Sequence, residues 1–213
     1  QASGAEYNTA VGHQTAYNLT TGKSNTFIGK GVAHNETTSS HNTAVGKYAM
    51  LYAQAGTGYN TAVGEFALAG TANYQTGNYN AAFGADSLKG ISSGSKNIGI
   101  GYQAADNITT GSNNVMIGGA DAASATGSDQ LSISSGDGSP VWITGTSNSL
   151  TAVQATTFSA GITDAGTIAA GTWSGTTIAV NKGGTGQTSY TNGQLLIGNT
   201  TGNTLTKATL TAG

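Results

Sequence analysis

Paired carboxylates are the groups with which a β-rich chain would cleave a polysaccharide, and the 213 residues include nine acidic side chains. They are Glu6, Glu36, Glu65, Asp86, Asp106, Asp121, Asp129, Asp137 and Asp164. Glu65 and Asp86 lie in neighbouring copies of a sequence repeat, but five and six residues, respectively, after the Asn that marks each copy. Because this offset keeps the two carboxylates off one strand position, we predict no catalytic site and no enzymatic activity.

Metal ligation is a second chemistry that the residue types allow. His13, His34 and His41 fall at different positions of the repeat, and no His-x-His spacing is present. The SGDGS stretch around Asp137 is typical of an ordinary turn, since the Gly-Gly-x-Gly-x-Asp calcium repeat is absent. The chain has no Cys, so neither a disulfide nor a thiolate metal site can form. We therefore predict no metal, no cofactor and solvent-facing histidines.

Aromatic side chains offer a third chemistry, the binding of carbohydrate. Tyr7, Tyr59 and Tyr79 each precede a repeat Asn and could line one edge of the molecule. Such a stripe either stacks between neighbouring copies of the repeat or binds sugar rings. Trp142 and Trp173 have the same two interpretations, since they either close an end or interface of the β structure or stack on sugars. The sequence leaves both interpretations open.

The repeat that must position these side chains has the pattern Asn-x-small-aliphatic-Gly and occurs seven times. Its asparagines are Asn8, Asn25, Asn42, Asn60, Asn80, Asn97 and Asn114. Successive asparagines are separated by 17, 17, 18, 20, 17 and 17 residues. One unit is thus repeated with small insertions in one loop, which is typical of a solenoid in which each unit forms one coil.

Two positions of the unit are consistently apolar. The first, three residues after the Asn and directly before a Gly, is occupied by Val11, Ile28, Val45, Val63, Phe83, Ile100 and Ile117. The second, eight residues after the Asn, is occupied by Ala16, Ala33, Met50, Leu68, Leu88, Ala105 and Ala122. Because side chains alternate along a strand, we predict that the first group forms the core, together with the residues two positions before it. The Gly then turns the chain, and a second short strand returns the second group to the same interior.

The composition favours regular β structure. Gly fills 34 positions, charged residues make up 8% of the chain, the net charge is −2 and there is one Pro. Disordered chains are usually richer in Pro and net charge, whereas Thr, Val, Ile and Tyr suit strands. The absence of Arg argues against a nucleic-acid partner. No run approaches the ~20 apolar residues of a membrane helix, so we predict no membrane insertion.

A single coil of this size is thin. It offers two or three modest apolar residues, too few to offset a backbone ordering cost of about 1 to 2 kcal/mol per residue. Stacked coils share hydrogen bonds and apolar files, and seven of them would form a rod on the order of 34 Å long. We predict that the aligned asparagines form a ladder, each amide bonding to the next, and that other copies complete the interior as a parallel homotrimer.

The units YNTAVG from Tyr7 and KNIGIG from Lys96, within residues 6–127, resemble the head repeats of YadA-like trimeric autotransporter adhesins. They are more similar still to the NTA(V/L)G repeats of bacteriophage tail fibres, and the GTWSG and GGTG sequences within residues 171–199 resemble segments of the same fibres. The resemblance implies a left-handed parallel β-roll in a trimeric extracellular fibre. The period of 17 or more residues exceeds the shorter adhesin unit, and the coiled-coil stalk, membrane anchor and chaperone of such proteins are absent.

We therefore predict an all-β protein, with a seven-coil β-roll over residues 1–127 and an irregular β-rich shaft over residues 128–213. Strands are expected at 130–134, 141–144, 176–180 and 194–198. The expected function is a structural or adhesive element of a phage tail fibre, with a host glycan or receptor as a possible partner. A bacterial trimeric surface adhesin, an extracellular filament subunit and a polysaccharide-degrading tailspike are the alternatives. Gln1 at the start and the missing segments predict a fragment or a processed chain.

Overall fold

The computed structural model of the chain describes residues 4–54, 58–71, 75–152, 194–199 and 204–209. These residues form strands and turns, with no helix among them. The chain divides into two compact units, Gln1–Thr157 and Phe158–Gly213, which are considered separately. The predicted strand at 176–180, Trp173 and Asp164 lie outside the described residues.

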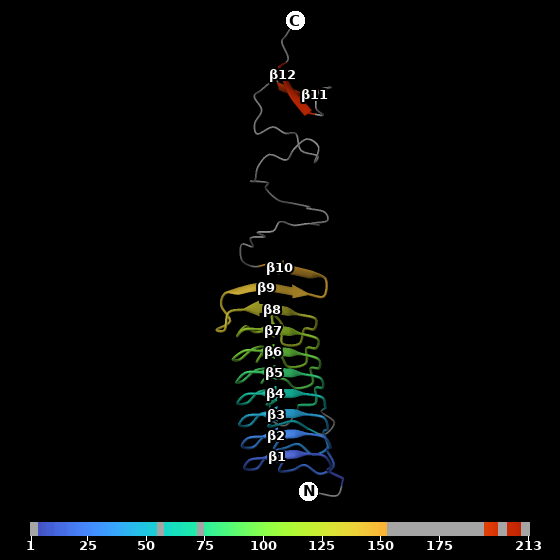
Figure 1. Cartoon of the computed structure of the whole chain (residues 1–213), viewed down its shortest axis with the longest axis vertical. Coiled ribbons are helices and arrows are strands. Elements are labelled where there is room, and N and C mark those ends of the chain that lie inside the picture. The colour runs from blue at the N-terminus through green and yellow to red at the C-terminus, as the bar shows by residue number, and fades with distance from the viewer. Residues whose placement is uncertain (1–3, 55–57, 72–74, 153–193, 200–203, 210–213) are drawn as a thin grey trace. The chain divides into compact units, whose positions relative to one another are not determined.

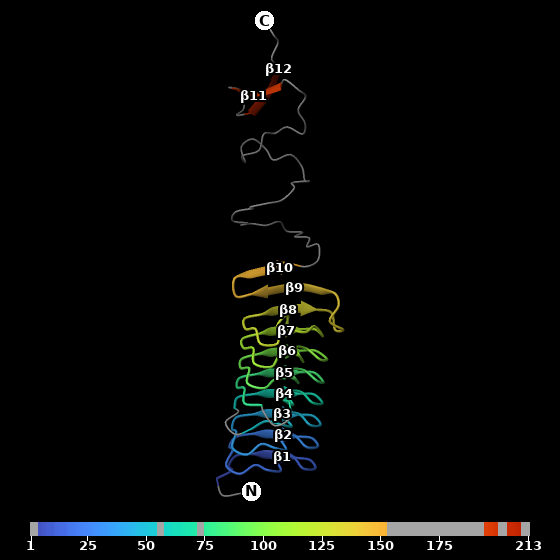
Figure 2. The same cartoon turned by 180° about the vertical axis from the view of Figure 1, so that it is seen from behind.

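The first unit is a stack of coils, each contributing one strand to a ten-stranded sheet in sequence order (Figure 1). The seven strands of the repeat are β1 (Thr9–Val11), β2 (Thr26–Ile28), β3 (Thr43–Val45), β4 (Thr61–Val63), β5 (Ala81–Phe83), β6 (Ile98–Ile100) and β7 (Val115–Ile117). Neighbouring strands are parallel, and equivalent repeat positions pair, as in Thr43 with Thr61. The predicted all-β parallel solenoid is confirmed, and Figure 2 shows the same stack from behind.

The inward-facing positions of the strands differ from the prediction. The middle residue of strands β2–β7 is buried, as in Phe27, Ala44 and Met116, which are at most 1% exposed, whereas Ala10 in β1 is exposed. The predicted core residues Val11, Ile28, Val45, Val63, Phe83, Ile100 and Ile117 lie on the outer face instead, and all of them except the partly buried Val45 are 37–56% exposed. The prediction was wrong by one residue, and such a slip moves every side chain of a strand to the other face.

The interior is narrow because each coil closes after few residues, so small side chains fit inside. In five coils, one of the two inward positions, the middle of the strand and the residue eight after the Asn, is large and the other is small. The pairs are Phe27 and Ala33, Ala44 and Met50, Ala62 and Leu68, Ala82 and Leu88, and Met116 and Ala122, all of them buried, whereas Gly99 and Ala105 are both small. The predicted inward position of the second group is therefore confirmed, and complementary volumes keep the interior filled.

The Gly after each strand turns the chain as predicted. Its φ is +133° to +139° in the first six coils, and a Cβ at Gly84 would lie 2.2 Å from the carbonyl oxygen of Gly101 in the next coil. The predicted second strand is absent from the described coils, because left-handed residues such as Tyr48 and Met50 replace extended backbone on the return path. Hydrogen bonds nevertheless continue between coils there, as from Met50 N–H to the carbonyl of Ala67 at 3.0 Å.

The sheet continues past the predicted boundary at residue 127. Strand β8 (Leu131–Ser134) adds an eighth parallel strand, and β9 (Val141–Thr146) and β10 (Ser149–Ala152) follow it in antiparallel pairing. In the second unit, β11 (Gln194–Asn199) and β12 (Thr204–Thr209) form an antiparallel pair. The strands predicted at 130–134, 141–144 and 194–198 are thus present, the first two as a continuation of the solenoid sheet.

Candidate functional site

The repeat asparagines form a continuous buried ladder at one corner of the coils. Each Oδ1 accepts the backbone N–H of the next Asn at 2.8–3.0 Å, from Asn8 to Asn25 and onward to Asn114. In several coils, the Nδ2 donates to a loop carbonyl, as from Asn80 to Gly94 at 3.0 Å. The side chain therefore closes its own coil and pairs with the next one, so the predicted ladder is present.

Gln130 extends this ladder where the Asn pattern has ended. Its N–H donates to Asn114 Oδ1 at 2.9 Å, and its Nε2 donates to the carbonyls of Ser124 and Gly127. The preceding residue, Asp129, has the left-handed φ that precedes every ladder residue. Sequence reasoning missed this eighth rung because it required Asn, although the Gln amide presents the same donor and acceptor groups.

The outer face of strands β1–β7 carries one apolar file, the set from Val11 to Ile117, that nothing in the described chain covers. The file beside it is Thr in the first four strands and continues as Ala81, Ile98 and Val115, of which Ile98 is 38% exposed. No strand from β1 to β8 contains a charged residue. We call this surface the aliphatic face. A long uncharged apolar sheet face on a rod is typical of a surface that binds another protein chain.

The carboxylate pair that sequence reasoning did not find is Asp106 with Asp121, on adjacent coils. Partial burial, a hydrogen bond to Asp121 and its negative charge raise the pKa of Asp106 to about 6. These residues lie nine and seven residues after their asparagines, so they do not share a position of the repeat. Hydrolysis of a glycosidic bond uses two carboxyl groups about 5 to 9.5 Å apart that flank the bond, whereas Asp106 and Asp121 interact with each other.

Most of the other acidic residues have structural contacts. Glu65 pairs with Lys47 at 2.6 Å, and Asp86 pairs with Lys89 at 2.7 Å. Buried Glu36 accepts the N–H groups of Thr37 and Ser39 in a turn. A pair of hydrogen bonds from Ser135 Oγ and Ser139 N–H lowers the pKa of Asp137 and defines the predicted turn there.

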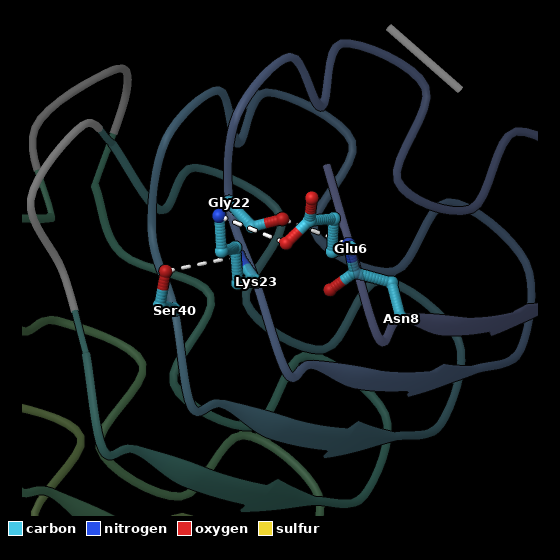
Figure 3. A network of polar contacts seen from close by, with 5 residues as sticks. All are labelled: Glu6, Asn8, Gly22, Lys23 and Ser40. Carbon is cyan, nitrogen blue, oxygen red and sulfur yellow. Dashed lines mark hydrogen bonds and ion pairs between the residues drawn. The ribbon is translucent and has the colours of Figure 1, made fainter. Parts of the chain in front are cut away.

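A polar network connects the first three coils (Figure 3). Lys23 Nζ lies 3.0 Å from Glu6 Oε2, and the Lys23 N–H donates to Ser40 Oγ at 2.9 Å. In the same view, Asn8 Nδ2 donates to the Gly22 carbonyl at 2.8 Å. Lys23 and Glu6 are about half exposed, so the ion pair contributes little stability and the backbone-linked bonds hold the loop.

The residues before the ladder asparagines form a stack of rings over three coils. His41 stacks on Tyr59 with centroids 4.7 Å apart, and Tyr59 stacks on Tyr79 at 5.1 Å. The predicted stacking between coils is therefore present at Tyr59 and Tyr79, and His41 belongs to it. A shallow groove of about 350 Å³ runs beside the rings. Tyr7 is 82% exposed.

The remaining histidines and Trp142 lie at the surface. His34 stacks on Tyr17 at 5.2 Å, His13 is exposed, and Trp142 on β9 is 46% exposed. Within the described ranges, no three His, Asp or Glu residues come together as a metal site. The part of the chain that the structure describes also holds no helix long and apolar enough to cross a membrane.

A ladder of amides, a narrow filled interior and an uncovered aliphatic face define the first unit as a repeat protein of the β-solenoid class. Comparison with protein-family models, with curated proteins and with solved structures gives no match for this chain.

Proposed function

We propose that the chain is a structural element of an extracellular fibre, most like a phage tail-fibre shaft, and that it assembles as a parallel homotrimer through the aliphatic face. The aliphatic face is the observation that carries this proposal. The NTAVG-type repeats favour a phage fibre, and a bacterial trimeric adhesin or filament subunit is the alternative source of the same architecture. The proposed role is to hold a receptor-binding part away from the particle or cell.

Parallel association suits the geometry of this face. Equivalent residues of every coil recur at one strand spacing, so parallel copies around a common axis would bring Ile100 opposite Ile100 at one level. Six of the aliphatic residues remain 37–56% exposed in the single chain. Burial of that remaining surface would contribute about 1 kcal/mol for each of them. The sum over the stack is large enough to hold copies together without any charged contact.

The test replaces Ile100, at the middle of the aliphatic face, by lysine. Sedimentation equilibrium should give about three chain masses for the wild type. The Ile100→Lys chain should keep its β-sheet circular dichroism but sediment as a monomer, because three ammonium groups would meet at one level. Ser93→Lys adds the same charge at an exposed loop position and should assemble like the wild type. A folded wild-type monomer, or unchanged assembly of Ile100→Lys, contradicts the proposal.

A polysaccharide-degrading tailspike is the second candidate, favoured only by the raised pKa of Asp106 beside Asp121. The interaction of the two carboxyls with each other, instead of with a bond between them, argues against it. Release of reducing ends from a host polysaccharide by the wild type, abolished in Asp121→Asn, would establish the enzyme and displace the purely structural proposal.

A further inference from the structure

We propose that the groove beside the His41–Tyr59–Tyr79 stack binds a neutral saccharide on the side of the fibre. This goes beyond a passive shaft, because the ligand would bind along the rod and not at its tip. The inference does not require the trimer, since the groove is formed within one chain. Its residues come from coils three to five, and its lining includes Ser40, His41, Gly58, Tyr59, Asn78 and Tyr79.

The backbone at these ring positions is unfavourable for bulky side chains. The φ values of His41, Tyr59 and Tyr79 are 63°, 58° and 60°, in the left-handed region that disfavours large residues. Of the other bulky residues in that region, Leu68 is fully buried, Phe66 is partly buried and Tyr7 is 82% exposed. Tyr59 and Tyr79 are each 55% exposed, so the fold gains little in return. The same left-handed φ precedes every ladder residue and therefore belongs to the coil, so the distinguishing feature here is the run of exposed rings in three neighbouring coils.

The fold does not require rings at this position. The equivalent residue is Tyr7 in the first coil and Ser24, Lys96, Asn113 and Asp129 in others, all with the same left-handed φ and with intact ladder bonds beside them. Three neighbouring coils therefore carry aromatic side chains at a position where serine or aspartate also allows the left-handed φ and the ladder hydrogen bonds. Ring stacking explains their mutual order, but it does not explain why exposed rings occupy this corner.

The groove combines apolar ring surface with groups that hydrogen-bond hydroxyls. Ser40 and Thr38 supply hydroxyl groups, Asn78 supplies an amide, and the two tyrosines supply phenol groups. Asn78 Oδ1 accepts the Gly58 N–H at 2.6 Å, which fixes the amide in the groove wall. A sugar presents the matching surface, with apolar C–H groups on one face and hydroxyls around its edge. The described lining residues include no carboxylate and no ammonium group, which favours a neutral ligand.

The repeat length points to the same coils. The separations of 18 and 20 residues, the only ones above 17, follow Asn42 and Asn60. Gly58 and Asn78, which line the groove, stand near the ends of these two lengthened loops. In repeat proteins, insertions in individual units gather on one face, which is often the binding face.

The test applies the full chain, wild type and variants, to an array of immobilised neutral and acidic oligosaccharides. Wild-type protein should bind a subset of the neutral ones. Tyr59→Ala and Tyr79→Ala should each weaken that binding about tenfold or more, because each removes ring surface from the site. Tyr17→Ala is the matched control, since Tyr17 is 67% exposed and stacks on His34 outside the groove.

Three results would overturn the inference. They are the absence of wild-type binding to any neutral oligosaccharide, equal loss in Tyr17→Ala and Tyr59→Ala, and undiminished binding by Tyr59→Ala. Sedimentation of the same variants separates the two proposals, since Tyr59→Ala should keep the wild-type mass. A change of assembly in Tyr59→Ala would show that the stack is a contact between copies of the chain and not a saccharide site.

Discussion

Removal of one rung from the asparagine ladder tests how the coils are held together. Asn80 is 1% exposed, and its Oδ1 accepts both the N–H and the Nδ2 of Asn97, at 2.9 and 3.1 Å. Its Nδ2 donates to the Gly94 carbonyl at 3.0 Å. The substitution Asn80→Ala leaves the Asn97 N–H and the Gly94 carbonyl without this partner. Asn97 Nδ2 keeps its bond to Gly111 at 2.9 Å.

The expected loss of stability follows from the two polar groups, the Asn97 N–H and the Gly94 carbonyl, that lose their hydrogen bond to Asn80. Each buried polar group left unsatisfied costs about 1 to 3 kcal/mol, so Asn80→Ala should lower the free energy of unfolding by about 2 to 6 kcal/mol. Because each coil contacts only its neighbours, a weak rung in the middle should also divide the stack into two cooperative units. Urea unfolding followed by circular dichroism measures both effects, the second as a broader or biphasic transition.

Asn18→Ala is the control, because Asn18 makes one exposed bond to the His34 carbonyl at 2.9 Å. Its cost should stay below about 0.5 kcal/mol. Equal costs for the two variants, or a loss below about 1 kcal/mol for Asn80→Ala, would refute the idea that buried side-chain ladders couple the coils.

Three further substitutions test the turns, the interior and the acidic pair. Gly84→Ala should cost at least about 3 kcal/mol in thermal unfolding, since its φ is +134°, whereas Gly136→Ala, with open space around it, should cost under about 0.5 kcal/mol. Phe27→Ala should cost about 3 to 5 kcal/mol of monomer stability in the Ile100→Lys background, and a cost under about 1 kcal/mol would contradict its inward placement. Asp106 has a pKa raised to about 6, so its stabilising contribution is complete below about pH 3.8 and is lost as the pH rises through 6. Asp106→Asn should therefore raise stability by about 1 kcal/mol at pH 8, after allowance for solvent screening, and leave it unchanged near pH 3.5.

The sequence predicts the solenoid well because its most regular positions have backbone roles. The positions of Asn80 and Gly84 are occupied by Asn and Gly in all seven copies of the repeat. The Asn makes the ladder hydrogen bonds, and the Gly has a φ that only Gly adopts without strain. Their spacing determines where each strand begins and ends. The same logic placed Leu88 in the interior, since its apolar character recurs at a fixed distance from the Asn.

Which residues of each strand point inward could not be predicted from apolar character alone. In β4 the sequence Thr-Ala-Val has its larger apolar residue at Val63 and its smaller one at Ala62, yet Ala62 is buried. The narrow interior beside the buried Leu68 leaves room for only a small residue on the strand, so the larger Val63 lies on the outer face. The size exchange between Ala62 and Leu68 carries this information, since only residues that share a cavity need complementary volumes.

The acidic pair and the ring stack escaped prediction for a different reason. Alignment compares residues at equal distances from the Asn, whereas Asp106 and Asp121 approach each other from unequal ones. His41 did share its position with Tyr59, but its role as a ring became visible only from the 4.7 Å stacking distance. Contacts between side chains on turns depend on backbone conformations that the repeat pattern does not specify.

Some repeat positions maintain the fold and one exposed position does not, and this difference connects the fold to both proposals. The ladder amide, the turning Gly and the paired interior residues hold the cross-section constant, so every coil stacks in register on the last. The position before the Asn lies outside this set, since Ser24 and Tyr59 share one backbone conformation there. Substitutions at that position can therefore change what the rod binds without changing the rod. In the proposed fibre, this separation would place binding specificity at the exposed corner and not in the core.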